Sequence, residues 1–147
     1  MRTYYRQRDL LVKKSSESIQ HMQKALIQMN ILLHTVLSDI TGKTGMLIIN
    51  AILAGEHDPK KLAAYRDRNC YKTQSQIELA LEGNYNEEHL FSLNLALDSF
   101  KHYQNQIAKC DNKIETYLKN FEECKNKEIN QSAKKKYGSK MVMSITK

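Results

Sequence analysis

The sequence predicts an all-α fold in which two long antiparallel helices with heptad seams form a coiled-coil hairpin, with an insert of short helices between them in the sequence. Two long heptad patterns, together with one Pro, five Gly and no Trp, favour helices over strands. A chain of 147 residues is long enough for one domain with its own core. We therefore expect a single helical domain over residues 1–125 and a basic, flexible tail over residues 126–147.

The first long helix is expected over residues 4–40. Its apolar side chains follow one another at alternating steps of three and four, which is the spacing of a heptad seam. The seam positions are Ile19, Met22, Leu26, Met29, Leu33 and Val36. The apolar face is widened by Ile27, Ile31, Leu32 and Leu37. One antiparallel helix cannot cover a face of this width, so we predict a homodimer through this helix. The alternative is that the insert, Met46 to Leu53 in particular, folds back over it.

The insert of short helices is expected over residues 41–85. Gly42 and Gly45 are predicted to break the first long helix. The pair Asp58–Pro59 marks a helix start, because Asp caps a helix and Pro fits its first position. Ser75, followed by Glu78, predicts a capping box and therefore a second helix start.

The second long helix is expected over residues 86–125. Asn86 is a plausible N-cap, and Glu87 and Glu88 place carboxylates in the first turn, where they favour the helix dipole. A second seam follows at alternating steps of three and four and includes Phe100, Tyr103, Ile107 and Ile114. The apolar period fails beyond about Lys125, so we expect this helix to end there.

The net charge of +7 is unevenly distributed. Residues 119–147 hold eight Lys and three Glu, a balance of +5, so most of the excess lies in the predicted tail. A lysine-rich tail is more often a solvated end than a binding arm. No apolar run approaches the length of a membrane span or a signal peptide, so we expect a cytoplasmic protein with no membrane partner.

The sequence contains no complete motif of a known catalytic, metal or nucleotide-binding site. Gly42, Lys43 and Thr44 resemble the end of a phosphate-binding loop, but Leu37 stands where that loop needs a glycine. The three Cys lack CxxC spacing, and the five His are scattered along the chain. We therefore expect no catalytic residue, no metal site and no cofactor.

One local pattern is compatible with phosphate binding. An apolar helix end, the turn Gly42–Gly45 and a second apolar helix resemble a helix-hairpin-helix unit, whose backbone N–H groups bind a phosphate. A corner between two helices that needs two flexible residues explains the same glycines equally well. In both cases Lys43 and Thr44 are expected to point outward.

Longer blocks of the sequence resemble one protein family. They are RQRDLLV at 6–12, IQHMQKALIQMN at 19–30, SDITGKTGMLIINAILAGEHDPKKLA at 38–63 and ALEGNYNEEHLFSLNLALDSFKHYQNQIAKCDNKIE at 80–115. Together they look like the middle, coiled-coil segment of the bacterial insertion-sequence transposases of the "IS one-ten" type. The resemblance covers residues 2–118 and ends at about Tyr117.

The resemblance implies a fragment without catalytic parts. That family has an N-terminal RuvC-like nuclease domain with a DEDD carboxylate tetrad and a C-terminal domain with a serine nucleophile, and neither has a counterpart here. The family acts on DNA, guided by a structured RNA, and its coiled-coil segment joins protomers. We therefore expect a bacterial, truncated transposase piece, either an excised domain or the product of a decayed gene.

Three hypotheses for the function follow. The leading hypothesis is a non-catalytic assembly segment in DNA transposition or recombination that joins protomers into a homodimer. The alternative is a module that binds DNA or structured guide RNA through basic residues and the Gly42–Gly45 turn. Its candidate phosphate contacts are Arg6, Arg8, Lys43, Thr44, Lys60, Lys61, Arg66, Arg68 and Lys72. The third hypothesis, an independent enzyme, lacks a site.

Overall fold

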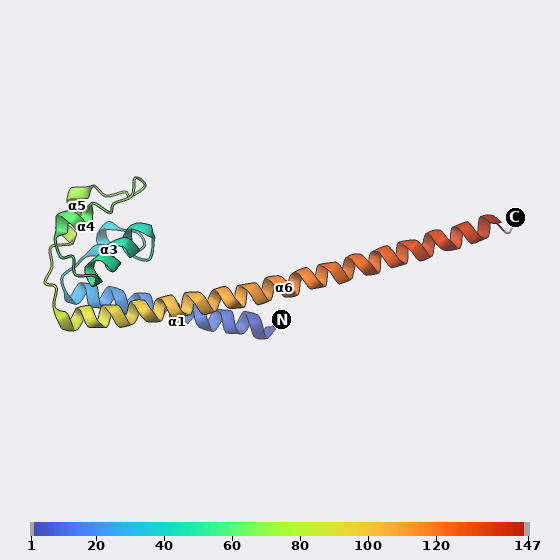
Figure 1. Cartoon of the computed structure of the whole chain (residues 1–147), viewed down its shortest axis with the longest axis horizontal. Coiled ribbons are helices and arrows are strands. Elements are labelled where there is room, and N and C mark those ends of the chain that lie inside the picture. Colours follow the sequence, from blue (N-terminus) through green and yellow to red (C-terminus); the bar gives the residue numbers. More distant parts are fainter. Residues whose placement is uncertain (1, 146–147) are drawn as a thin grey trace. The chain divides into compact units, whose positions relative to one another are not determined.

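The computed structural model of the chain describes residues 2–145, with side chains for residues 2–136 (Figure 1). All regular structure over this range is helical, which confirms the predicted all-α class. The helices are α1 (Arg2–Gln28), α2 (Leu33–Val36), α3 (Lys43–Leu53), α4 (Pro59–Ala63), α5 (Gln74–Ala80) and α6 (Glu87–Ile145). The long α6 packs on α1. None of the helices described here is long and apolar enough to cross a membrane.

Backbone contacts divide the chain into two compact units. The central unit is Leu11–Asn105, and the terminal unit combines the chain up to Leu10 with the chain from Gln106 onward. Helices α1 and α6 each contribute residues to both units. The single domain predicted over residues 1–125 stays a prediction.

The first long helix is shorter than predicted, because α1 ends at Gln28 and not near residue 40. Asn30 adopts a left-handed conformation with φ of 56°. The N–H of Ile31 donates to the carbonyl of Leu26 at 2.8 Å, and the N–H of Asn30 donates to that of Ile27 at 2.9 Å. These two bonds form a Schellman motif, in which Asn tolerates the left-handed position better than most residues. The chain therefore leaves the helical path well before Gly42.

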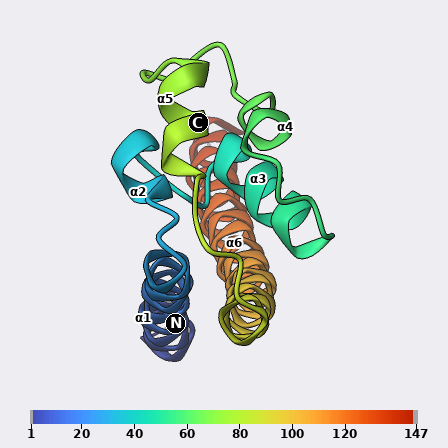
Figure 2. The ribbon, with the colours of Figure 1, turned by 90° about the vertical axis from the view of Figure 1, so that its left-hand side faces the viewer.

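The hydrophobic core of the central unit joins α1 and α6 to the insert. Its buried side chains come from every helix of the insert as well as from the two long helices. Figure 2 shows α2 to α5 gathered on one side of α1 and the first part of α6. They include Met22, Leu26, Leu33, Ile48, Ile49, Ile52, Leu62, Ile77, Leu81, Leu93 and Leu97. Ile31 and Leu37 are also buried in this cluster, whereas Ile27 and Leu32 are 49% and 38% exposed. The insert thus covers much of the apolar face on which the predicted homodimer was based.

The short helices of the insert begin at side-chain caps. The carboxylate of Asp58 accepts a hydrogen bond from the N–H of Lys60 at 3.1 Å, and Pro59 opens α4, as predicted. The capping box of α5 is instead formed by Thr73 and Gln76, which exchange bonds of 2.9 and 3.3 Å. The prediction of Ser75 with Glu78 is wrong, because two overlapping segments fit the same pattern and the helix starts at the earlier one.

The last helix begins as predicted and continues further. Asn86 accepts a hydrogen bond from the N–H of Glu88 at 3.0 Å, which is the expected N-cap bond. Helix α6 then extends to Ile145, beyond the expected end near Lys125. Residues 115–136 are all exposed and contain no Pro or Gly, so helix propensity without burial accounts for this part of the helix. The flexibility of the tail stays a prediction, and residues 146–147 lie outside the described residues.

Candidate nucleic-acid interface

A cleft of about 500 Å³ lies at the start of α3 in the central unit. Three of the predicted phosphate contacts, Lys43, Thr44 and Lys72, line it. Gly42 and Gly45, which the sequence also indicated, line it as well, and the rest of its wall includes His34, Asp39, Asp67, Cys70 and Tyr71. An aromatic residue next to a lysine in a predicted loop, Tyr71–Lys72, is the sequence pattern that could have predicted this side of the cleft. The fold thus brings the start of α3 together with the loop between α4 and α5.

The N-terminus of α3 opens the cleft. Gly42 occupies the N-cap position in an extended conformation, and no side chain caps the helix. Backbone N–H groups in the first turn of an α-helix have no partner inside the helix, and the helix dipole adds positive character there. This end of α3 is therefore the part of the cleft that best suits a negative group.

Thr44 does not point outward, so this part of the prediction is wrong. Its side chain is 6% exposed. Its Oγ1 accepts a hydrogen bond from the N–H of Asp67 at 3.2 Å and lies 3.4 Å from the Sγ of Cys70. Because these contacts hold the loop after α4 against α3, Thr44 has a structural role and is not available to a phosphate.

Gly45 is explained by close packing. A Cβ at this position would overlap the carbonyl oxygen of Ile40 and lie 2.6 Å from its carbonyl carbon. At Gly42, a Cβ would lie 3.2 Å from the carbonyl oxygen of Asp39, which is a tight contact. The spacing of the two glycines is therefore accounted for by the corner between two segments, without a ligand.

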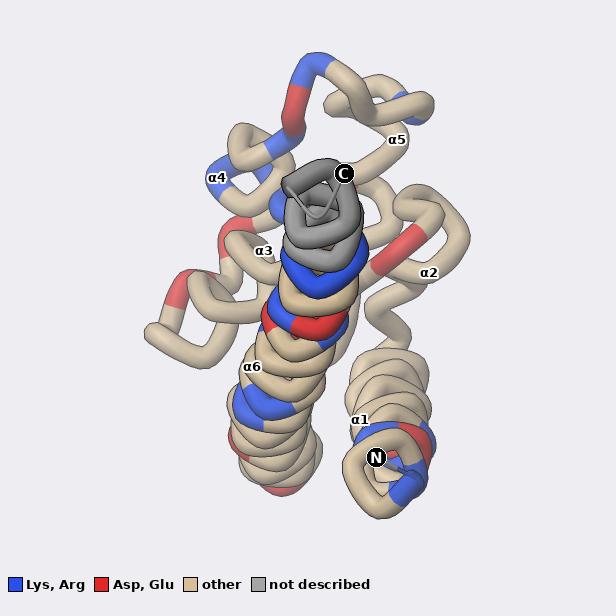
Figure 3. The backbone as a smooth tube through the Cα atoms, turned by 90° about the vertical axis from the view of Figure 1, so that its right-hand side faces the viewer, with Lys and Arg blue, Asp and Glu red and all other residues tan. Residues whose placement is uncertain are grey.

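The charges along the cleft are balanced. Lys43 and Lys72 line it together with Asp39 and Asp67, two cations and two carboxylates. The carboxylate of Asp39 accepts bonds from the N–H and the hydroxyl of Thr41 at 2.9 and 2.6 Å. Figure 3 shows basic and acidic positions next to each other along α4 and the loop that follows it. The cleft therefore lacks the excess positive charge that is typical of a phosphate-binding surface.

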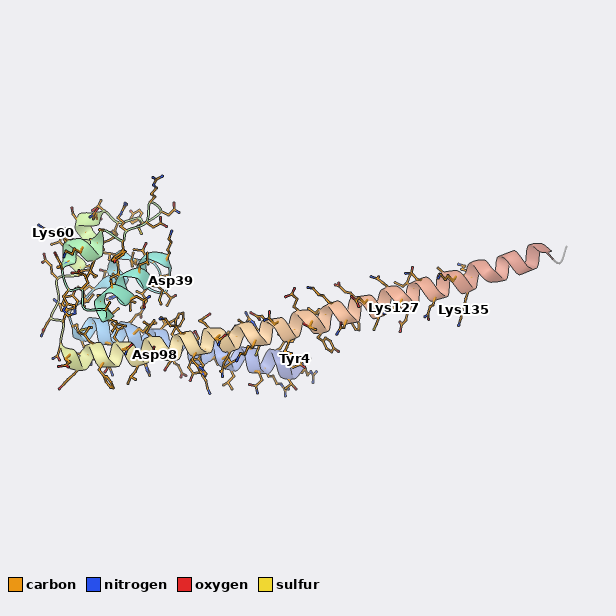
Figure 4. All side chains as sticks on the ribbon, in the orientation of Figure 1. Tyr4, Asp39, Lys60, Asp98, Lys127 and Lys135 are labelled. Atoms are coloured by element: carbon orange, nitrogen blue, oxygen red, sulfur yellow. The ribbon has the colours of Figure 1, made fainter. Side chains whose placement is uncertain are left out.

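The remaining basic residues of the central unit have different roles. Arg66 donates from Nε to the carbonyl of Lys72 at 2.6 Å and from Nη2 to that of Cys70 at 2.9 Å, which closes the loop on itself. Lys60, labelled in Figure 4, and Lys61 are exposed on α4, and Lys61 lies 3.9 Å from a carboxylate oxygen of Glu56. Arg68 is exposed in the loop. Arg66 is thus a structural residue, whereas Lys60, Lys61 and Arg68 are open to solvent.

Arg6 and Arg8 belong to the terminal unit. The Nε of Arg8 lies 2.6 Å from Oδ1 of Asp111, in an ion pair. This hydrogen bond and the negative charge of Asp111 raise the pKa of Arg8. Arg6 is exposed on α1. Arg8 therefore has a partner within its own unit.

The residues predicted as an association seam are buried or half-buried within the chain. Six of them are buried, namely Met22, Leu26, Met29, Leu33, Ile107 and Ile114. Four are half-buried, namely Ile19, Val36, Phe100 and Tyr103. The seam therefore contributes first to the fold of one chain.

In residues 2–145, no group of three or more His, Cys, Asp or Glu side chains is placed to hold a metal ion.

Comparison with known proteins adds no identification. No protein-family model, no curated protein and no solved structure matches the chain.

Proposed function

We propose that the chain is a non-catalytic, helical assembly segment of a DNA transposase and that it joins protomers. The proposal rests on the resemblance of residues 2–118 to the middle segment of the "IS one-ten" type transposases. The observation that carries it is the heptad seam of α6, which keeps its register from Leu93 to Cys124 within a helix of 59 residues. A long helix with such a seam is the usual means by which helical proteins associate.

Within this proposal, α1 and α6 form an antiparallel coiled-coil hairpin. Two features of the central unit support the opposite directions of the helices. Ser15 accepts a hydrogen bond from Gln104 at 2.8 Å, whereas Lys24 and Gln28, further along α1, line one pocket with Ser92 and Leu95 of α6. The residue number on α6 rises as that on α1 falls. The buried seam positions on both helices are consistent with side chains that interlock in this arrangement.

A homodimer through the predicted Ile19 to Ile40 face is part of the proposal. Ile27 and Leu32 support it, because both keep a large exposed fraction on this face. Co-expression of two differently tagged copies tests it, and each tag is expected to recover the other copy. Ile27→Glu should weaken this recovery, whereas Gln28→Glu on the neighbouring exposed surface should not. If each tag recovers only its own copy of the unmodified chain, the proposal is contradicted.

Nucleic-acid binding is the second candidate function. The observation that favours it is the cleft, where Lys43 and Lys72 flank the uncapped start of α3 and Tyr71 is 93% exposed beside them. A gel shift with DNA and with RNA at two salt concentrations tests it, because phosphate contacts give an affinity that falls steeply with salt. The double variant Lys43→Ala, Lys72→Ala should then bind more weakly. We place this function second because the two aspartates balance the two lysines.

A further inference from the structure

The part of α6 that follows Ile114 carries an exposed apolar stripe. Three large apolar side chains on it are between 43% and 52% exposed, namely Tyr117, Leu118 and Phe121. Cys124 is exposed as well. A contiguous apolar surface of this kind on a water-exposed helix usually marks an interface. Figure 4 shows the side chains projecting from α6 on both sides of Lys127.

The stripe continues the heptad seam of α6, whose earlier positions are buried. Tyr117, Phe121 and Cys124 follow Ile114 at steps of three, four and three, in the register that buries Leu93, Ala96, Ile107 and Ile114. In the terminal unit the buried part of this seam lies beside α1, which is tied to α6 by the Arg8–Asp111 pair. Because a heptad seam is filled by the side chains of another helix, the expected cover for the stripe is also a helix.

The charges around the stripe favour a protein partner over a polyanion. Residues 115–128 contain three Lys and four Glu, a net charge of −1. Two such segments do not repel each other strongly, and neither has the excess of positive charge that attracts a nucleic acid, unlike the lysines at 134–136 further along α6. The stripe also lies at and beyond Tyr117, where the resemblance to the transposase family ends.

We propose that the stripe packs against the same stripe of a second copy of this chain. Pairing of two copies covers both stripes at once, because each copy supplies the helix that the other lacks. Phe121 lies in the middle of the stripe and is the side chain that such a pair buries most fully. This inference rests on the self-association in the proposed function, and it adds a contact on α6 to the one around Ile27.

Sedimentation of the full chain over a dilution series tests this inference. Phe121→Lys should raise the dissociation constant of the dimer by at least about tenfold. Asn126→Lys adds the same charge to an exposed position on another side of α6 and should leave the dissociation constant unchanged. Both positions are exposed, so both variants should keep their helix content, which circular dichroism checks.

The outcomes separate this inference from the proposed function. A dimer that persists unchanged in Phe121→Lys would overturn the α6 contact and leave self-association standing. A monomer at every concentration of the unmodified chain would overturn both. A photo-reactive phenylalanine analogue at position 121 adds a direct readout, with crosslinks expected between two copies within residues 115–128. Crosslinks confined to a single chain would count against the inference.

Discussion

Gly45→Ala is the sharpest perturbation of the fold around the cleft. The added Cβ would lie 2.6 Å from the carbonyl carbon and 2.8 Å from the Cα of Ile40, and both of these are backbone atoms. Relieving such overlap requires α3 to move away from Ile40, and overpacking of this kind costs about 1–3 kcal/mol. Ala is favoured over Gly inside a helix by at most about 1 kcal/mol, so the clash should dominate.

The assay is thermal unfolding followed by circular dichroism. A net loss of about 1 kcal/mol lowers the midpoint by about 4–8 °C in a unit of the size of Leu11–Asn105. Gly42→Ala is the matched control, because its Cβ would meet one carbonyl oxygen at 3.2 Å, and it should cost less. A Gly45→Ala chain as stable as the original would refute the close approach of α3 to Ile40 and our explanation of the glycine spacing.

Three further predictions follow from single features. Ile107→Asp should lower the thermal midpoint strongly, since an unpaired carboxylate at a buried position costs several kcal/mol, and an unchanged midpoint would count against the heptad register of α6. Burial raises the pKa of Tyr85 to about 12. Its neutral form is favoured in the folded chain, so this contribution to stability is present below about pH 10 and is lost as pH rises toward about 12. Titration of tyrosine absorbance should show this late step, and Tyr85→Phe should remove it. Added magnesium should produce no DNA cleavage, and activity abolished by a single substitution in this chain would contradict the scaffold proposal.

The heptad spacing predicted burial better than it predicted helix ends. The steps of three and four correctly marked Met22, Leu26 and Ile107 as interior positions. They could not locate the end of α1, because Leu33 and Leu37 stay buried after the chain has left the helix. That end depends on the Schellman motif at Asn30, a local feature that the apolar period does not register. At the other end of the chain, α6 continues past Lys125 without burial, so the apolar period carries no information there.

The candidate site depended on contacts that are distant in sequence. An apolar helix after Gly42 was correctly predicted, since a glycine and a following apolar run are local signals. The predicted turn over Gly42–Gly45 is wrong, because α3 already begins at Lys43 and Gly45 lies inside it. The burial of Thr44 follows from its bond to the backbone of Asp67, which is 23 residues away. Sequence spacing cannot report a partner at that distance, and it could not show that Asp39 and Asp67 share the cleft with Lys43.

The measurement that tests the assembly proposal most directly is the mass of the chain in solution across a dilution series. The chain has a mass of 17.1 kDa. Self-association predicts a species of about twice that mass at high concentration, which dissociates on dilution by mass action. Sedimentation equilibrium reports this mass without a tag or a label. A mass of 17.1 kDa at every concentration would contradict the proposal that the chain joins protomers.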